Sequence, residues 1–482
     1  MRRVAILVFI ILFFYSTAPA DVIHLKNGRT ISADRVHQNG DKLEYEIGDD
    51  SYAIPMSTVD KIESGLAPSS GGVTSATASG TQQGSSELRR EMPNASALFA
   101  EINAAESAAV AAKVIGNGEV DHEALARIEN MHNSHLTALA YDAVAANAER
   151  TGDLETAERY LRLALSLEPQ QSLATAHYAS LLIESFRYAE AEPVAEQATR
   201  LAPRDPQMWY LLGMAHYFSN HAPAAIEAWK HSLSLRPSYR VQQLLARAQR
   251  EQIVQADYRN TDSVHFILEY EGQQTSPELR QSLVRALESD FDDLSNEFGF
   301  SPRDSIAVVV YTNRDYSAAT DAPSWSDGFN DGKIRIPVKN MESLTPEVAG
   351  VLKHELSHTF IRQISRDRCP QWLNEGIAQL EQGRSSASYG ALLRVLYSQN
   401  KQIPLSRLEG SFAVLPGMVA TVAYAESVAA AEVIRDGGGF SDLVRILGRI
   451  GSGMTTDQAL RSTIHSSYSD LDDQIKNRVA GK

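Results

Sequence analysis

The sequence contains a single cysteine, Cys369, so no disulfide can form within the chain. Positive charge is also in short supply, because 45 lysines and arginines face 60 aspartates and glutamates, a formal net charge of −15. A negative surface repels phosphate backbones and anionic lipid headgroups, so neither nucleic acid nor an anionic membrane is expected as a partner. At 482 residues the chain has room for two or three domains, whose stability must come from packed cores.

Long apolar runs are scarce, and the one that stands out is at the start of the chain. Residues 4–15 are apolar, follow Arg2 and Arg3, and precede Ala18-Pro19-Ala20. This order is typical of a secretory signal peptide, with cleavage expected after Ala20. The apolar core is too short to cross a bilayer, and no cysteine near the cleavage site could carry a lipid. We therefore expect an exported, periplasmic protein without stable membrane insertion.

The region behind the predicted signal peptide (residues 1–20) changes character twice. Within residues 21–64, apolar and acidic side chains alternate over residues 43–47, and the Asn-Gly pairs at 27–28 and 39–40 are hairpin-turn signals. We expect a small all-β, SH3-like module that serves as an adaptor or binding module. Residues 65–95 are rich in Ser, Gly, Thr and Ala in their first two thirds, which predicts a flexible linker.

Residues 96–256 are predicted to be helical and repetitive. A Leu-x-Pro triplet recurs every 34 residues, beginning at Leu167, Leu201 and Leu235. Small residues return at equivalent positions between the triplets: Ala145, Ala179 and Gly213, then Ala157, Ala191 and Ala225. Period and pattern resemble tetratricopeptide repeats, whose paired helices stack into a solenoid. The resemblance implies a concave surface that docks a protein partner, with a rigid spacer as the alternative.

One short motif carries metal chemistry: His354-Glu355-Leu356-Ser357-His358. Histidines four residues apart on a helix share a face, so both imidazoles can reach one metal ion. Thr345 is expected to cap this helix, with Pro346 at its first position. Two solvated histidines on a surface helix are the alternative that the motif alone leaves open.

A second segment supplies a carboxylate. Glu375 lies in Trp372-Leu373-Asn374-Glu375-Gly376, on a helix expected to begin at Pro370 and to end near Gly383. Two histidines and one carboxylate suit a catalytic zinc, which keeps a fourth position for water. Together the two motifs resemble the gluzincin metallopeptidases, in particular the peptidase MA-like group, over residues 257–482.

The resemblance implies an α+β zincin-type domain and a set of roles. His354, His358 and Glu375 would bind one catalytic Zn²⁺, which lowers the pKa of bound water to about 7. Glu355 would act as general base on that water and pass the proton to the leaving amine of a protein or peptide substrate. A tyrosine downstream of the glutamate ligand often stabilises the oxyanion in gluzincins, which points to Tyr424. A packing role for Tyr424 is the alternative.

Two further segments of residues 257–482 are predicted to be strands. Residues 332–338 alternate apolar and basic side chains, and Pro337 cannot donate to a ladder, which predicts an edge strand. In similar peptidases the strand before the zinc helix lines the cleft and pairs with an extended substrate, whereas an ordinary sheet edge is the alternative. Residues 306–311 are predicted to be a buried strand. Cys369 is expected to be a small buried thiol.

The sequence thus predicts a multidomain protein: a small β module, a helical repeat solenoid and a zincin-type domain. The favoured function is an exported zinc metallopeptidase whose repeats recruit substrate or a partner. The alternative is a non-catalytic assembly or scaffold factor with a structural or vestigial metal domain. Retention of all three ligands and Glu355 favours catalysis. A zinc hydrolase acting on non-peptide amides, such as cell-wall cross-links, has no dedicated motif.

Overall fold

The computed structural model describes residues 21–25, 30–33, 35–39, 42–47, 50–63, 104–272, 275–320, 328–337, 343–412 and 415–481. Contacts divide the chain into two units, residues 1–79 and 80–482. The predicted signal peptide (1–20) and linker (65–95) lie outside the described residues and stay predictions.

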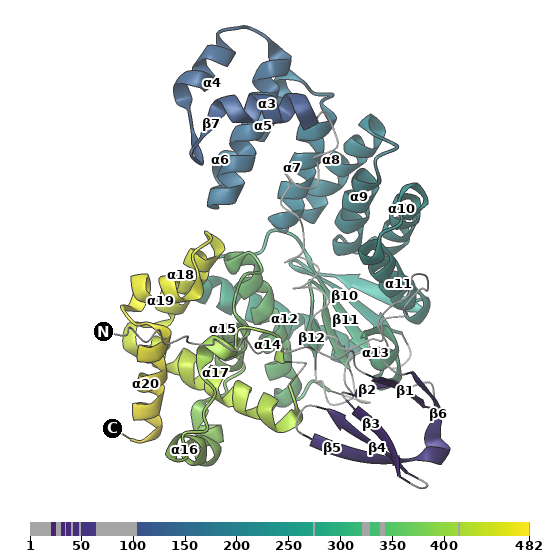
Figure 1. Cartoon of the computed structure of the whole chain (residues 1–482), viewed down its shortest axis with the longest axis vertical. Helices are drawn as coiled ribbons and strands as arrows, with labels where there is room; N and C mark the ends of the chain where they lie inside the picture. Colours follow the sequence, from purple (N-terminus) through teal and green to yellow (C-terminus); the bar gives the residue numbers. More distant parts are fainter. Residues whose placement is uncertain are drawn as a thin grey trace, which may run out of the picture. The chain divides into compact units, whose positions relative to one another are not determined.

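The described residues of the first unit form two antiparallel sheets (Figure 1). Their elements are β1 (Asp21–Leu25), β2 (Thr30–Ala33), β3 (Arg35–Asn39), β4 (Lys42–Ile47), β5 (Asp50–Pro55), the 3₁₀ turn η1 (Met56–Thr58) and β6 (Val59–Glu63). The strand orders are β2-β1-β6 and β3-β4-β5. Leu43 and Val59 are buried in this unit. The predicted all-β module is confirmed.

The second unit begins with a helical region. Its elements are α3 (Ala104–Val114), the short hairpin β7 (Ile115–Gly116) and β8 (Glu119–Val120), α4 (His122–Glu129), α5 (Ser134–Thr151), α6 (Leu154–Leu167), α7 (Ser172–Glu184), α8 (Tyr188–Leu201), α9 (Pro206–Phe218), α10 (Ala222–Leu235) and α11 (Tyr239–Val254). Helices α5 to α10 form successive antiparallel pairs (Figure 1).

The three repeats predicted from the 34-residue period are confirmed. Helices α6, α8 and α10, the second of each pair, end at Leu167, Leu201 and Leu235, where the Leu-x-Pro triplets begin. The small residues Ala145 and Ala179 are fully buried between helices, as close packing of paired helices requires.

A five-stranded mixed sheet follows the repeats. Its strands are β9 (Tyr258–Asp262), β10 (Phe266–Glu271), β11 (Ile306–Tyr311), β12 (Phe329–Asn330) and β13 (Ile334–Pro337), in the order β12-β13-β11-β10-β9. The β10–β11 and β11–β13 pairs are parallel, whereas β9 and β12 are antiparallel to their neighbours. Every residue of β11 is buried, so the predicted buried strand is confirmed.

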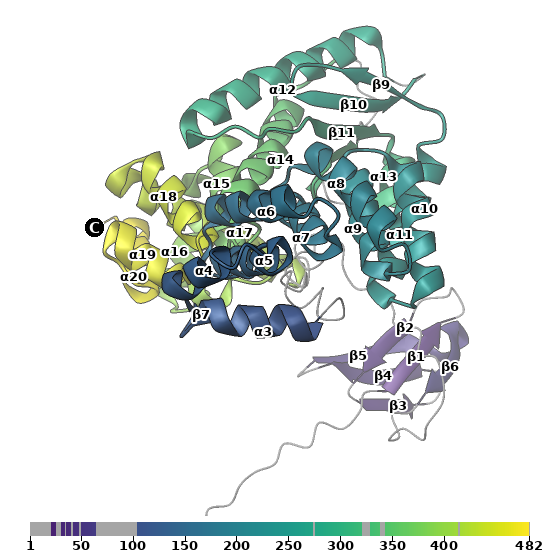
Figure 2. The same cartoon turned by 90° about the horizontal axis from the view of Figure 1, so that it is seen from above.

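The sheet is covered on both faces. The remaining elements are α12 (Pro277–Phe298), α13 (Asn313–Thr320), α14 (Pro346–Ser365), α15 (Gln371–Glu381), η2 (Ser386–Tyr389), α16 (Gly390–Ser398), η3 (Leu405–Arg407), α17 (Gly417–Gly438), α18 (Phe440–Gly451), α19 (Thr456–Ile464) and α20 (Tyr468–Val479). Val308 and Val310 of β11 belong to the core that α12 and α14 share, and Figure 2 shows α12 running beside β10. Val309 and Tyr311 point the other way and pack with α13.

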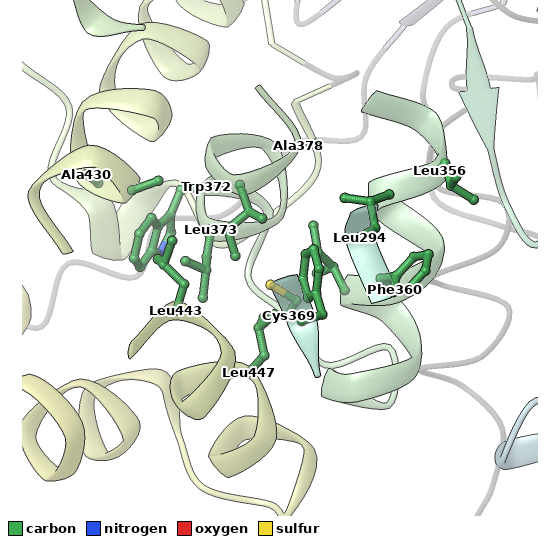
Figure 3. Close-up of a cluster of buried hydrophobic side chains, with 14 of the residues drawn as sticks. Leu294, Leu356, Phe360, Cys369, Trp372, Leu373, Ala378, Ala430, Leu443 and Leu447 are labelled. Carbon is green, nitrogen blue, oxygen red and sulfur yellow. The ribbon is translucent and has the colours of Figure 1, made fainter. Parts of the chain in front are cut away.

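Aromatic and aliphatic side chains of α12, α14, α15 and α18 fill the core behind the helix that carries the two histidines. Figure 3 shows Leu294, Leu356 and Phe360 on one side of this core and Trp372 and Leu373 of α15 on the other. The sulfur of Cys369 lies in this core, and the residue is 8% exposed. The prediction of a buried thiol is therefore confirmed.

Helix α17 is long and apolar enough to cross a membrane by length and composition, and it is the single such helix among the described residues. In the structure 61% of its most apolar window is buried, and its alanines pack against α15 in the core. This environment is that of a core helix.

The prediction that residues 332–338 form an edge strand is wrong. Strand β12 pairs with β13 at Arg335 and Ile334, so the edge belongs to β12. Pro337 lies beyond these pairs, and its missing N–H therefore costs no bond to β12. The basic side chains of the segment do not face solvent either, because Lys333 is buried against Asn220 and Arg335 against Glu251 of α11.

The repeats contact the sheet-containing region through the turn of each helix pair. Between α5 and α6, the Gly152 carbonyl accepts a bond from Arg366 (2.7 Å). At the start of α8, the backbone N–H of Ala189 donates to Asp304 (3.0 Å). Between α9 and α10, the Asn220 side chain bonds Lys333 and a glutamate of β10. The solenoid is therefore fixed along one side.

Candidate metal centre

Helix α14 presents the two histidines because its ends and its apolar face are well defined. The Thr345 hydroxyl accepts from the backbone N–H of Val348 (3.4 Å), which confirms the predicted cap. Leu352, Leu356 and Phe360 are fully buried on the opposite side. The helix therefore has an apolar back and a front that carries His354 and His358.

Helix α15 brings the carboxylate to the same place. Pro370 is its N-cap and Gly383, with φ of +80°, follows its end, so both predicted limits are confirmed within a residue or two. Gly376 permits a close crossing with α17, because a Cβ at that position would lie 2.4 Å from the carbonyl oxygen of Ser427. The crossing brings Tyr424 of α17 toward Glu375.

The structure brings His354, His358 and Glu375 together. His354 Nε2 lies 3.4 Å from Glu375 Oε2, and His358 Nε2 lies 3.9 Å from Glu375 Oε1. One ligand atom from each of the three residues lies within 4.8 Å of the others. Ligand atoms that surround a zinc tetrahedrally at 2.0–2.2 Å are separated by about 3.3 Å, so small adjustments would close the set on an ion.

The polar environment of these three residues also fits a cation. Glu375 Oε2 is buried, and its contact with His354 Nε2 is long, at 3.4 Å. A buried carboxylate oxygen with so weak a hydrogen bond is costly, and a bound cation would satisfy it. The donor set of two imidazoles and one carboxylate is one that zinc accepts.

The pKa shifts of His358 and Glu375 are those that metal ligands need, whereas the shift of His354 is opposite while no ion is bound. Burial lowers the pKa of His358 to about 4, although Glu375 opposes this, so the imidazole is neutral at pH 7. Burial raises the pKa of Glu375, but His358 and His354 outweigh it and leave the pKa below its ordinary value. Burial lowers the pKa of His354, but the hydrogen bond to Glu375 and the negative charge of Glu375 outweigh burial, so the pKa lies above its ordinary value.

Two neighbouring side chains orient the candidate ligands, and neither was assigned a role of its own from the sequence. His358 Nδ1 donates to Asn374 Oδ1 (2.9 Å), which leaves Nε2 unprotonated and directed toward Glu375. Gln371 Nε2 donates to Glu375 Oε1 (2.8 Å) from one turn earlier on α15. Asn374 stands inside the Trp-Leu-Asn-Glu-Gly motif, so its adjacency to Glu375 was the available signal.

Glu355 is set apart from the ligands by its surroundings. It is 7% exposed, and burial raises the pKa of its carboxyl to about 7. The charge of His354 acts to lower this pKa, and the charge of Glu375 acts to raise it. Its carboxylate lies against Gly328, where a Cβ would come within 2.7 Å of Oε1. Asn330 of β12 donates its amide to the Glu355 carbonyl (2.5 Å) and to Thr359 (2.8 Å).

Tyr424 belongs to the same environment. The charge of Glu375, then burial, then the charge of Glu355 raise the pKa of Tyr424 well above 10. Its ring meets Phe412 edge-on at 5.4 Å, and its carbonyl accepts from Gln379 (3.0 Å). The hydroxyl thus stays protonated close to both carboxylates, while its role as an oxyanion donor remains a prediction.

Fold and site together define a helical-repeat protein joined to a zincin-like domain. The Peptidase MA superfamily matches residues 286–481, and the tetratricopeptide repeat family matches residues 150–215. The chain therefore carries tetratricopeptide repeats followed by a C-terminal Peptidase MA superfamily domain, as the sequence motifs predicted.

Other comparisons add little. The search of curated proteins finds no match. Among solved structures, a mutant O-GlcNAc transferase of Thermobaculum terrenum is similar at 14% identity over 72% of this chain and 99% of that chain. Its TM-score is 0.24, so it supports no statement about this protein.

Proposed function

We propose that the protein is an exported zinc-dependent metallopeptidase that hydrolyses peptide bonds. The observation that carries the proposal is the juxtaposition of His354, His358 and Glu375 with a buried Glu355 whose pKa is raised to about 7. A general base works best when its pKa lies near the working pH. The Peptidase MA superfamily match supports the same class of chemistry.

Each residue of the candidate metal centre has a separate role in the proposed reaction. His354, His358 and Glu375 would hold the zinc, which when bound supplies a Lewis acid for the scissile carbonyl and for water. Glu355 takes the proton from the attacking water and delivers it to the leaving amine. Tyr424 donates a hydrogen bond to the developing oxyanion. Asn374 and Gln371 fix the orientations of His358 and Glu375 through hydrogen bonds.

The repeats have a second role in this proposal, which is to recruit a protein substrate or partner. Tetratricopeptide repeats commonly bind proteins, and three turns fix this array to the sheet-containing region. A protein bound by the repeats would therefore be held at a constant position relative to the candidate metal centre.

The test compares Glu355→Gln with the wild type on denatured casein and on a quenched fluorescent peptide library. We expect Glu355→Gln to retain zinc and to lose about 10²- to 10⁴-fold in rate, because proton transfer is removed while the ligands stay. Glu347→Gln is the matched control, since Glu347 is an exposed residue in the first turn of the same helix.

Full activity of Glu355→Gln would end the assignment of the general base. A wild type that binds zinc but hydrolyses neither probe would favour the alternative of a non-catalytic assembly factor. Hydrolysis of non-peptide amides alone would favour the third function.

A further inference from the structure

A second group of potential metal ligands lies in the repeats, remote in sequence from the candidate metal centre. It consists of Glu192 on α8, His216 in the last turn of α9, and His221, the N-cap of α10. His216 Nδ1 lies 3.1 Å from Glu192 Oε1, and His221 Nδ1 lies 2.7 Å from the same oxygen. One ligand atom from each residue lies within 4.8 Å of the others.

The two distances between histidine nitrogen and carboxylate oxygen are close to those in a zinc site. Nitrogen and oxygen ligands around a tetrahedral zinc are about 3.3 Å apart, slightly more than the distances here. Four residues separate His216 from His221, within the range of three to five that is usual for histidine pairs in zinc sites. The two rings are 6.2 Å apart and inclined at 63°, so they converge on the carboxylate from different directions.

Charge and access also suit a cation. Burial raises the pKa of Glu192, but the bonds from His221 and His216 outweigh it and leave the pKa below its ordinary value. Its side chain is 19% exposed and that of His216 14%, whereas that of His221 is 59% exposed. The group thus combines an ionised, partly buried carboxylate with one side open for entry of an ion and a water.

The turn that carries His221 is held in place before any ion binds. The backbone N–H of His221 donates to the carbonyl of His216 (2.8 Å). Asn220 adopts a left-handed conformation with φ of +67°, and its side-chain oxygen accepts from Lys333 Nζ (2.9 Å). A fixed turn lowers the entropy that a metal would have to remove on binding.

We propose that Glu192, His216 and His221 form a second metal site, for a divalent cation of the zinc class, in addition to the candidate metal centre. Two imidazoles with one carboxylate favour zinc over calcium or magnesium, which prefer oxygen ligands. The ion ties α8 to the turn between α9 and α10. Because Asn220 in this turn bonds Lys333 beside β13, the metal stabilises the junction between repeats and sheet.

The experiment counts zinc in the mature chain after loading with Zn²⁺ and dialysis, by mass spectrometry of the metal. We expect the wild type to retain two ions, His221→Ala and Glu192→Gln one each, and His221→Ala combined with His358→Ala none. The exposed residue His122 on α4 supplies the matched control, since His122→Ala removes a histidine outside both groups. Circular dichroism checks that each variant is folded.

A second readout uses His358→Ala, which lacks one ligand of the candidate metal centre. Added Zn²⁺ is expected to raise the Tm of this variant, and the rise is expected to vanish when His221→Ala is added. The proposal is overturned if His221→Ala and Glu192→Gln retain as much zinc as the wild type. If His358→Ala retains as much zinc as the wild type while His221→Ala and Glu192→Gln each retain less, the proposed peptidase loses support and the second site stands.

Discussion

At the scale of single residues, the candidate metal centre depends on side chains outside the set of proposed ligands. The two histidines and Glu375 have the right spacing, but an imidazole can rotate and can carry its proton on either nitrogen. Asn374 removes both freedoms from His358 by accepting its Nδ1 proton. Gln371 restricts the rotation of the Glu375 carboxylate by donating a hydrogen bond to one of its oxygens.

Asn374→Ala is therefore expected to weaken zinc binding at this centre by about 10- to 100-fold, because His358 loses its orienting partner. The measurement is a competition titration with a chromophoric chelator in the His221→Ala background, which isolates one site. Asn374→Asp keeps an acceptor at the same place and is expected to restore most of the affinity. Equal affinity of Asn374→Ala and its parent would show that His358 is oriented by other contacts.

At the scale of elements, β13 and α11 are joined by a buried group of charges. Arg335 is fully buried and donates to Glu251 (2.8 Å), which is 1% exposed and also accepts from Arg247 (3.1 Å) and Tyr217 (2.9 Å). Arg335 and Arg247 each bond Asp331 as well. Such a group is stable only when complete, because each charge has left water.

Glu251→Gln is expected to cost about 3–5 kcal/mol in unfolding free energy at neutral pH, as loss of one partner from a buried pair does. Burial raises the pKa of Glu251, but Arg335, Arg247 and Lys333 lower it to about 2, from an ordinary 4.5. The stabilisation by Glu251 is then present above about pH 4.5 and is lost as pH falls toward 2.

Urea unfolding at pH 7, 4 and 3 measures this linkage. The difference between wild type and Glu251→Gln should shrink as pH falls, whereas the control Glu123→Gln, whose side chain is 90% exposed, should stay close to the wild type throughout. A difference that is constant with pH would mean that Glu251 does not carry the charge in the folded state.

At the scale of the whole molecule, the repeats and the sheet-containing region behave as one unit. Helix α11 closes the solenoid and also contributes Glu251 to the second face of the sheet, and Gln255 behind it donates to Tyr311 of β11 (2.5 Å). The three repeat turns add contacts along one side. The repeats are thus a structural part of the candidate enzyme, in addition to their proposed role in recruiting a partner.

A fragment that begins at residue 257 is accordingly expected to unfold at a lower urea concentration than the full chain, or not to fold. In this fragment Arg335 would lose the carboxylate of Glu251, and Lys333 would lose the side-chain amide of Asn220. Equilibrium urea unfolding followed by circular dichroism measures both midpoints. Equal midpoints would contradict the expectation, and the repeats would then be removable without loss of the fold.

Local patterns determined much of this protein. The Thr345 cap, the histidine spacing on α14, the motif around Glu375 and the 34-residue period are short-range features, so the sequence was enough to predict them. The helices and the repeats lie where these patterns placed them, and His354, His358 and Glu375 lie together, while their role as zinc ligands stays a prediction. Periodicity and spacing act within one element or between adjacent ones, where chain geometry fixes which side chains meet.

Only the tertiary structure decided the rest. The alternation of apolar and basic residues around β13 suggests a solvated edge strand. In the structure Glu251 of α11, 84 residues away, pairs with Arg335, and β12 is the strand at the edge of the sheet. Asn330 beneath Glu355, and Glu192 between His216 and His221, also join segments distant in sequence. Such contacts depend on how whole elements pack, because burial and partners for polar groups are set by neighbours that no local pattern specifies.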